Sequence, residues 1–320
     1  MSDPNDGGVV HQRTIATPEL SPTSNPDVVP SQRPPVDRYI GRTLDGRYLV
    51  EQLLGEGGMG QVWKAVDQNT NRIVAKKYLK SIAPEDRKRF DREARILFRA
   101  RGVENIVQII EYRLDNHPPY IVTEYCEGGS LATKVGSLDH IQATNVLSCM
   151  VKALKFIHGQ GGIHRDIKPA NILLAFRKAL WVSKLSDFGI ARNPEPGTSM
   201  TQTPIGTREY FAPEVLRGED FTEAADIYSL GLTIRELITG SREATINTLV
   251  IPFRLQSLLS EMLAPEPWRR PTIYQVEERV NAIIRSRGDL IGNVVSSVSP
   301  VTVGLGLLVG LVVSAISDKK

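Results

Sequence analysis

The sequence H-R-D-I-K-P-A-N-I-L-L at residues 164–174 is the most informative part of the chain. It places Asp166, Lys168 and Asn171 at the spacing DxKxxN. An aspartate can accept a proton from an attacking hydroxyl group, and a lysine two residues later can neutralise a γ-phosphate as charge moves. An asparagine offers the hard oxygen that Mg²⁺ prefers. The stretch therefore predicts a centre for phosphoryl transfer, with Asp166 and Lys168 as catalytic residues and Asn171 as a metal ligand.

A second acidic group follows sixteen residues beyond Asn171, in Asp187-Phe188-Gly189. Its carboxylate can hold the metal that bridges the β- and γ-phosphates of a nucleotide. Each of these residues alone would be an ordinary surface polar group. The full set in this order has little chance of arising at random, so Asp187 is expected to be the second metal ligand.

Upstream, L-G-E-G-G-M-G-Q-V at 54–62 contains the pattern GxGxxG. Glycines let backbone amides approach phosphate oxygens closely. Dinucleotide-binding folds share the pattern, but there the glycine turn opens a helix. Here residues 61–66 continue as a strand, so the loop is expected to join two strands and cover a nucleotide. The expected binding residues are Leu54, Gly55, Glu56, Gly57, Gly58, Gly60 and Val62.

The next strand, I-V-A-K-K-Y-L at 73–79, carries two adjacent lysines. Side chains alternate between the faces of a strand, so Lys77 shares a face with Ala75 and the nucleotide, whereas Lys76 points the other way. If the alignment were wrong by one residue, Lys76 would take the role of Lys77. A separate alternative is that both lysines are solvated strand residues. Glu93, on a helical pattern at 84–101, is expected to pair with Lys77 and orient it.

The order of segments predicts an α+β chain with a strand-rich piece before a helix-rich piece. Short apolar runs rich in β-branched residues predict strands, whereas apolar residues spaced by three and four predict helices. The expected strands are 47–54, 61–66, 72–79, 106–113 and 119–125, and the later helices are 139–159, 221–239 and 252–264.

Composition narrows the class of protein. The 320 residues are 41% apolar and 23% charged, which is typical of a globular protein and excludes a coiled coil, a collagen or a wholly disordered chain. The net charge of +3 and the lack of a basic block give no sign of nucleic-acid binding. Cys126 and Cys149 fit neither a disulfide framework nor a metal-ligand spacing, which favours a reducing compartment.

From 47 to about 285, the sequence resembles the eukaryotic-type Ser/Thr protein kinases, and it is similar to the membrane-attached kinases of bacteria. The resemblance implies a bilobal fold, with a β-rich N-lobe at 41–126 and a helical C-lobe at 127–288. ATP and Mg²⁺, or Mn²⁺, would lie between the lobes.

The resemblance also assigns residues outside the first motifs. It implies a gatekeeper at Thr123, a hinge from Glu124 to Cys126 whose backbone meets adenine, and a buried acid, Asp226, that braces the catalytic loop. Glu214 of Ala212-Pro213-Glu214 would pair with Arg270. Between Gly240 and Pro271 the chain has only about 30 residues, fewer than the family commonly has, which puts substrate docking by the usual surface in doubt.

Specificity and control are further expectations from the resemblance. Lys168 and Thr207 match the pattern of enzymes that phosphorylate Ser and Thr. Thr201 and Thr203 resemble an autophosphorylated pair, for which Arg165 is a ready phosphate partner. The alternative is a loop that is merely rich in threonine. Trans-autophosphorylation would need two copies to meet, so a homodimer stays open.

The two ends of the chain differ from the middle. Residues 1–40 contain seven prolines and few large apolar residues, which predicts a disordered leader, either plain or phosphorylated at Thr-Pro and Ser-Pro sites. Residues 290–317 carry no charge, which predicts a membrane span followed by a tail at 318–320. The alternative is a buried core helix. With a span, the protein would be a single-pass protein of the cell membrane with a cytoplasmic kinase domain.

The sequence is compatible with three functions. The leading one is an active Ser/Thr kinase, switched on by autophosphorylation, that acts on protein substrates. The second is a membrane-anchored pseudokinase scaffold that binds nucleotide without phosphoryl transfer. The third is a small-molecule phosphotransferase of related fold, which would usually lack the Lys168 pattern and the Ala212-Pro213-Glu214 sequence.

Overall fold

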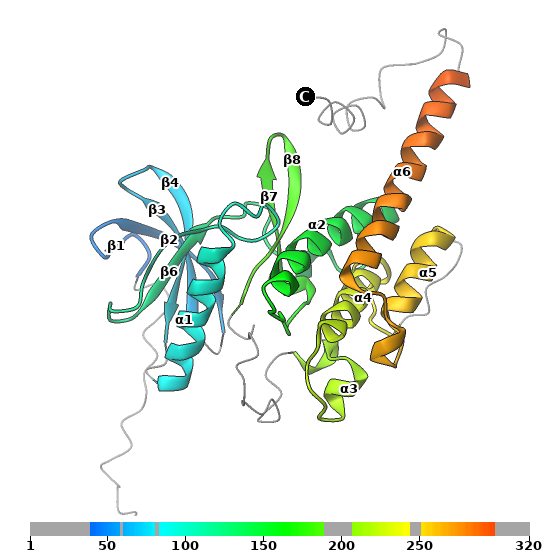
Figure 1. Cartoon of the computed structure of the whole chain (residues 1–320). Coiled ribbons are helices and arrows are strands. Elements are labelled where there is room, and N and C mark those ends of the chain that lie inside the picture. The colour runs from blue at the N-terminus through cyan, green and yellow to red at the C-terminus, as the bar shows by residue number, and fades with distance from the viewer. Residues whose placement is uncertain (1–38, 58–59, 81–82, 189–206, 244–250, 298–320) are drawn as a thin grey trace, which may run out of the picture. The chain divides into compact units, whose positions relative to one another are not determined.

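The computed structural model describes residues 39–57, 60–80, 83–188, 207–243 and 251–297. Nearly all of the leader predicted at 1–40, and the residues of the apolar segment from 298 on, lie outside this set. The described residues form a strand-rich lobe followed by a helical lobe (Figure 1). This arrangement confirms the α+β, bilobal class.

The N-lobe is an antiparallel sheet with one helix beside it. Among the described residues the strand order is β1-β2-β3-β4-β6-β5. The strands are β1 (Thr43–Leu44), β2 (Tyr48–Glu56), β3 (Gly60–Asp67), β4 (Arg72–Leu79), β5 (Ile109–Arg113) and β6 (Tyr120–Glu124). The glycine loop joins β2 to β3, so it connects two strands, as predicted.

Helix α1 (Pro84–Arg99) follows β4 and supplies an acid to the cleft. Pro84 starts the helix, where a missing N–H costs nothing, and Glu85 and Asp86 favour the positive end of the helix dipole. The buried face includes Phe90 and Glu93. The apolar stripe therefore fixes the rotation of the helix that turns Glu93 inward.

The C-lobe is built on α2 (His140–Gly159) and α4 (Glu223–Thr239). Asp139 caps α2 by accepting hydrogen bonds from the backbone N–H groups of Ile141 and Gln142. Gly240 ends α4 with a left-handed conformation, φ 77°. The other α-helices are α3 (Pro213–Leu216), α5 (Phe253–Met262) and α6 (Ile273–Ser297). Short 3₁₀ turns are η2 (Leu131–Lys134), η3 (Pro169–Asn171), η4 (Arg208–Tyr210) and η5 (Pro267–Arg269).

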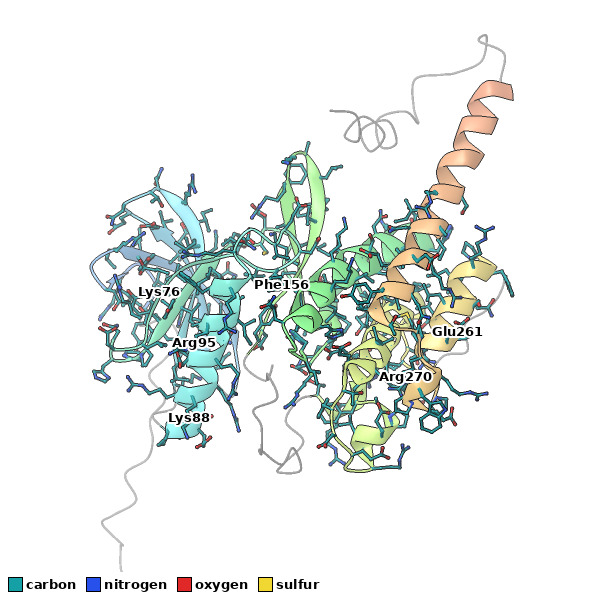
Figure 2. All side chains as sticks on the ribbon, viewed as in Figure 1. Lys76, Lys88, Arg95, Phe156, Glu261 and Arg270 are labelled. Atoms are coloured by element: carbon teal, nitrogen blue, oxygen red, sulfur yellow. The ribbon has the colours of Figure 1, made fainter. Side chains whose placement is uncertain are left out.

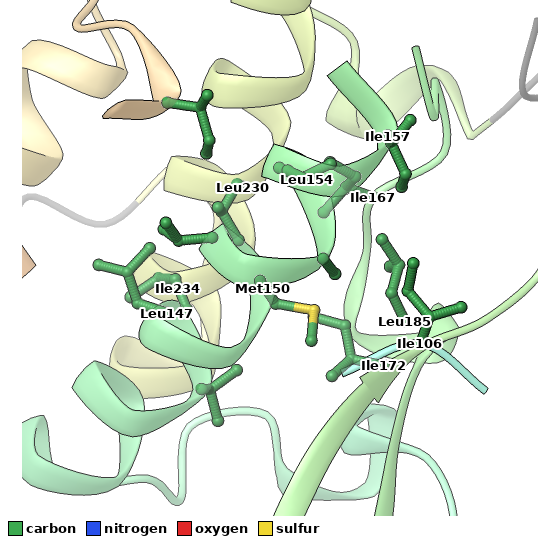
Figure 3. Packing of buried hydrophobic residues seen from close by; sticks show 14 of the residues in the cluster. Ile106, Leu147, Met150, Leu154, Ile157, Ile167, Ile172, Leu185, Leu230 and Ile234 are labelled. Atoms are coloured by element: carbon green, nitrogen blue, oxygen red, sulfur yellow. The ribbon is translucent and has the colours of Figure 1, made fainter. Parts of the chain in front are cut away.

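The catalytic stretch (residues 164–174) runs into a two-stranded hairpin formed by β7 (Ile172–Arg177) and β8 (Leu180–Leu185). Its inner residues join the apolar core of the C-lobe (Figure 3). Met150 and Leu154 of α2 and Leu230 and Ile234 of α4 are fully buried there. Burial of each such side chain contributes about 1.5–3 kcal/mol, so this core holds the catalytic stretch on a rigid base.

Two elements differ from the sequence expectation. The hairpin β7–β8 and helix α6 were not predicted, although the apolar positions Ile273, Val276, Val280 and Ile283 lie at helical spacing and are buried. Helix α6 runs without a break through residues 288–290, where a change from kinase domain to membrane segment was expected. Within the described ranges, no helix has both the length and the apolar content that crossing a membrane requires.

Candidate active site

A cleft of about 780 Å³ lies where the glycine loop, α1, the hinge and the catalytic stretch meet. Every described residue predicted to bind nucleotide lines it: Leu54, Gly55, Glu56, Gly57, Gly60, Val62, Ala75, Lys77, Glu124 and Cys126. Gly58 lies outside the described residues. The structure thus brings together groups that are 72 positions apart in the sequence.

The glycines of the loop differ in whether their surroundings leave room for a side chain. A side chain at Gly60 would place its Cβ 1.9 Å from the carbonyl oxygen of Tyr78, so this glycine is required by the close approach of β3 and β4. A Cβ at Gly55 or Gly57 would meet open space. Packing therefore does not require glycine at these two positions, which leaves their backbone free to approach phosphate.

Lys77 points into the cleft and pairs with α1, as predicted. Its Nζ lies 2.8 Å from both carboxylate oxygens of Glu93 and 3.4 Å from Oδ1 of Asp187. Burial opposes the charge of the lysine, but Glu93 and Asp187 outweigh it and raise the pKa of Lys77. The ammonium group is therefore charged and held where it can bind phosphate oxygens.

Lys76, labelled in the N-lobe in Figure 2, is fully buried and has partners other than those of Lys77. Its Nζ lies 2.5 Å from Oδ2 of Asp45 and 3.6 and 3.9 Å from the ring centroids of Tyr120 and Tyr48. These contacts are cation–π and ionic interactions. The alternative in which both lysines are solvated is therefore wrong.

Asp166 is the centre of the catalytic stretch and is buried. Its carboxylate accepts hydrogen bonds from Lys168 Nζ at 2.8 Å, the backbone N–H of Thr207 at 3.0 Å and Asn171 Nδ2 at 2.8 Å. Burial alone would raise the pKa of Asp166, but these donors, Lys168 first among them, lower it overall. The residue is thus a carboxylate at neutral pH and can accept a proton.

Asp226 is hydrogen-bonded to the backbone at the start of the catalytic stretch. Its carboxylate accepts the backbone N–H groups of His164 at 2.8 Å and Arg165 at 2.9 Å, and it contacts Nε2 of His158 at 2.9 Å. Burial would raise the pKa of Asp226, but the hydrogen bond with His158 and nearby donors keep it low. Arg165 has a positive φ of 73°, and the two hydrogen bonds from the backbone to Asp226 can stabilise this uncommon conformation.

Asn171 and Asp187 both line the cleft. Because Nδ2 of Asn171 donates to the backbone oxygen of Asp166 at 2.7 Å, the amide oxygen of Asn171 is the end of the side chain that can bind a cation. Asp187 has φ 62°, and the next residue, Phe188, is buried with its ring centroid 5.0 Å from that of His164. An amide oxygen and a carboxylate are donors that fit Mg²⁺.

The hinge contains a charge cluster that sequence reasoning missed. Glu124 lies 2.8 Å from Lys184 Nζ and 2.5 Å from Arg177 Nη2, and it also accepts the backbone N–H of Gln108. Both cations come from the β7–β8 hairpin. Basic residues within a largely apolar pair of strands were the available signal. This cluster ties the hinge to the hairpin.

Thr123 and Cys126 flank the hinge acid and line the cleft, together with residues not predicted to do so. Burial raises the pKa of the Cys126 thiol to about 12. The thiol is therefore protonated at neutral pH, and it has no catalytic assignment. The unpredicted lining residues include Val107, Ile121, Ser130 and Leu173.

Three further predicted residues, Glu214, Arg270 and Thr207, do not line the nucleotide cleft. Glu214 and Arg270 form two parallel contacts of 2.6 and 2.8 Å, and both side chains are buried. Thr207 Oγ1 accepts a hydrogen bond from Lys168 at 2.5 Å. Thr201 and Thr203 lie outside the described residues, so their relation to Arg165 stays a prediction.

With these groups in place, the chain belongs to the protein kinase family: residues 48–280 match the protein kinase domain. The resemblance seen in the sequence is therefore confirmed.

Among the relatives, the chain is 37% identical over 215 residues to the serine/threonine-protein kinase PknA of Mycobacterium tuberculosis, covering 63% of this chain and 49% of the relative. It is 39% identical over 209 residues to PknB of Mycobacterium leprae, covering 62% and 33%. It is 31% identical over 258 residues to pkn3 of Myxococcus xanthus, covering 74% and 45%. The matched region spans half or less of the length of each of these relatives.

Proposed function

We propose that this chain is an ATP-dependent kinase that transfers the γ-phosphoryl group to Ser or Thr hydroxyls of proteins. One observation carries the proposal: the carboxylate of Asp166 is held by Lys168, Asn171 and the backbone of Thr207 at the edge of the cleft. This arrangement sets a proton acceptor beside a cation and a metal ligand. Names of the relatives, which are serine/threonine-protein kinases, support it.

The residues act as follows in this proposal. Lys77, aligned by Glu93, holds the phosphates of ATP under the glycine loop. Asp166 accepts the proton of the attacking hydroxyl, and Lys168 offsets the negative charge that builds on the γ-phosphate. A divalent cation, Mg²⁺ or Mn²⁺, would be held by Asn171 and Asp187 and would neutralise charge on the β- and γ-phosphates.

The choice of Ser and Thr rests on Thr207. Its hydroxyl group accepts a hydrogen bond from Lys168, and its backbone donates one to Asp166, so this residue ties the substrate side of the site to the catalytic base. A pseudokinase scaffold remains the second candidate. It predicts nucleotide binding without transfer. The pairing of Lys77 with Glu93 and the hydrogen bonds of Lys168 and Asn171 to Asp166 support the active kinase instead.

The test is phosphoamino-acid analysis of a generic acceptor protein after incubation with labelled ATP and Mg²⁺. We expect phosphoserine and phosphothreonine without phosphotyrosine. Phosphotyrosine as the main product would overturn the assignment to Ser and Thr. Nucleotide binding without any label would favour the scaffold.

Control by autophosphorylation is part of the proposal. A phosphate on Thr201 or Thr203 would pair with Arg165 and order the segment that follows Asp187. The double variant Thr201→Ala, Thr203→Ala should therefore lose activity by about tenfold or more while remaining folded. Full activity in that variant would remove autophosphorylation from the account.

The C-terminal segment indicates where in the cell the chain would be found. Residues 290–317 carry no charge, so we propose that they attach the chain to a bilayer with the kinase domain on the side that holds ATP. Extraction of cell membranes at alkaline pH should leave the full chain in the pellet. Complete release into the supernatant would contradict insertion.

A further inference from the structure

The end of the β7–β8 hairpin is an exposed apolar and basic surface, here called the hairpin tip and defined as residues 176–181. Phe176, Leu180 and Trp181 are 49%, 49% and 57% exposed, and the rings of Phe176 and Trp181 lie 5.3 Å apart. Large apolar side chains gathered in this way on an exposed hairpin point to a binding partner.

The hairpin tip is held firmly. Lys178 and Ala179 form its turn with φ 47° and 65°, values that non-glycine residues rarely adopt. Arg177, beside the turn, pairs with Glu124 of the hinge. The ring of Trp181 also packs so closely on Gly128 that an added Cβ there would lie 2.6 Å from it. The turn therefore presents its side chains in a fixed arrangement.

Charge indicates what the hairpin tip would bind. Of the three basic residues at 172–184, Arg177 and Lys184 are paired with Glu124 and Glu127. The charge that this segment presents outward is therefore that of Lys178, which is exposed at the turn. A tryptophan beside a lysine is typical of segments that lie at the boundary between lipid and water. The composition thus matches an anionic lipid surface.

The placement of the hairpin agrees with this partner. Helix α2 packs against both β8 and α6, and the hairpin tip and the C-terminal end of α6 point toward the top of Figure 1. Helix α6 extends to Ser297, so it includes the first eight of the 28 uncharged residues at 290–317. A bilayer reached by that segment would lie on the side toward which the hairpin tip points.

We propose that the hairpin tip docks on the anionic surface of the bilayer to which the C-terminal segment attaches, with Trp181 and Phe176 at the boundary between headgroups and acyl chains and Lys178 beside anionic lipid. The inference rests on the proposed membrane attachment. Docking would fix the orientation of the kinase domain and, through Arg177 and Glu124, would hold the hinge next to the membrane.

The chain offers its own control for this inference. Trp268 is 82% exposed and lies in η5, before the start of α6. Helix α6 has 25 residues, which correspond to about 37 Å, so Trp268 is far from the C-terminal end of that helix. Trp63 is buried in the N-lobe and should be shielded from lipid.

The experiment uses the full chain reconstituted in vesicles of phosphatidylcholine with about one third phosphatidylglycerol, with and without brominated acyl chains. Bromine quenches the fluorescence of a tryptophan only on contact. We expect quenching in the unaltered chain and in Trp268→Phe, and its loss in Trp181→Phe. Lys178→Asn should weaken the quenching roughly fivefold in anionic vesicles, and asparagine is chosen because it tolerates the positive φ at this position. The control variant Lys88→Asn on α1 should leave the quenching unchanged.

The outcomes separate the proposals. A chain that does not float with vesicles overturns both membrane attachment and docking. A chain that floats while Trp181 is not quenched overturns docking alone. Shielding of Trp181 that depends on protein density but not on bromine would indicate a second copy of the chain and would also overturn docking. Phosphate transfer, measured in the same vesicles, reports on the kinase proposal independently.

Discussion

Lys76 and Lys77 are adjacent in the sequence and have opposite surroundings. Their facing was predictable, because alternation along β4 places Ala75 and Lys77 on one face of the sheet. The surroundings of Lys76 were not predictable, because Tyr48, Tyr120 and Asp45 come from distant parts of the chain and meet only when the sheet forms. The sequence thus predicts which face of the sheet each lysine occupies, whereas the residues that contact it are known only from the fold.

The two lysines should therefore respond differently to the same substitution. Lys77→Met removes the cation that faces the cleft, and we expect the rate of phosphate transfer to fall by at least about 100-fold. Lys76→Met fills the space between Tyr48 and Tyr120 with an apolar side chain. It leaves Asp45, which is partly exposed, in contact with water. Its rate should stay within about threefold of the unaltered chain.

Transfer rates with saturating ATP, together with thermal melting curves that establish folding, check this pair of variants. If Lys76→Met abolished transfer and Lys77→Met did not, the register of β4 described above would be wrong.

Asp166 leads to a prediction about pH. Its pKa lies below the ordinary 3.8 because its hydrogen-bond donors outweigh burial. The active carboxylate is present above that pKa and is lost only as pH falls through it. The ratio kcat/KM for the acceptor should therefore show no loss from Asp166 between about pH 8 and pH 5.

Replacing the cation beside Asp166 tests the cause of this behaviour. In Lys168→Met, the acid limb of the pH profile should move to higher pH, because a stabiliser of the carboxylate is gone. Both profiles need a fluorescence check that the protein stays folded. An acid limb at the same pH in both proteins would assign it to another group.

At the scale of elements, periodic segments were predictable and paired or docked segments were less so. Helix α1 (Pro84–Arg99) and β4 (Arg72–Leu79) match the expected 84–101 and 72–79 closely, because proline, acid and apolar spacing mark them. The hairpin β7–β8 was missed because its first strand reads as an apolar tail of the catalytic stretch. Its tight turn has no glycine to mark it, since Lys178 and Ala179 adopt the positive φ values.

The contact between α3 and the segment after η5 predicts a large effect on stability. Glu214 and Arg270 are buried and paired through two contacts. Glu214→Gln leaves the guanidinium without its counter-charge, so the free energy of unfolding should fall by about 3–5 kcal/mol.

The double variant Glu214→Gln, Arg270→Met should recover part of that loss, because no uncompensated charge remains. Urea unfolding followed by tryptophan fluorescence measures all three proteins. A loss in Glu214→Gln below about 1 kcal/mol would mean that water reaches the pair.

At the scale of the whole molecule, the order of a strand-rich piece and a helical piece was predictable from the sequence. The cleft was predictable only through resemblance, because no local pattern brings Gly55, Glu93 and Asp187 together. What joins them is the apolar core that continues from Phe90 and Ile121 into Met150 and Leu185. The hinge cluster around Glu124 arises in the same way, from elements that meet after folding.

Removal of residues 298–320 tests whether the described elements are sufficient. This truncation ends after α6, so it keeps every helix and strand given above. We expect a folded kinase with an unaltered rate of transfer and a melting temperature within about 2 °C of the full chain. Loss of folding would instead favour the reading in which residues 290–317 form a core helix.

Replacement of Asp166 shows whether this residue supports phosphoryl transfer. The full chain and Asp166→Asn are incubated with radiolabelled ATP and Mg²⁺, nucleotide binding is measured in parallel, and phosphorylated sites are mapped by mass spectrometry. We predict label on the acceptor and on Thr201 or Thr203, with a loss of about 1,000-fold in Asp166→Asn and unchanged nucleotide binding. Equal label in both proteins, or none in a folded chain that binds ATP, would contradict it.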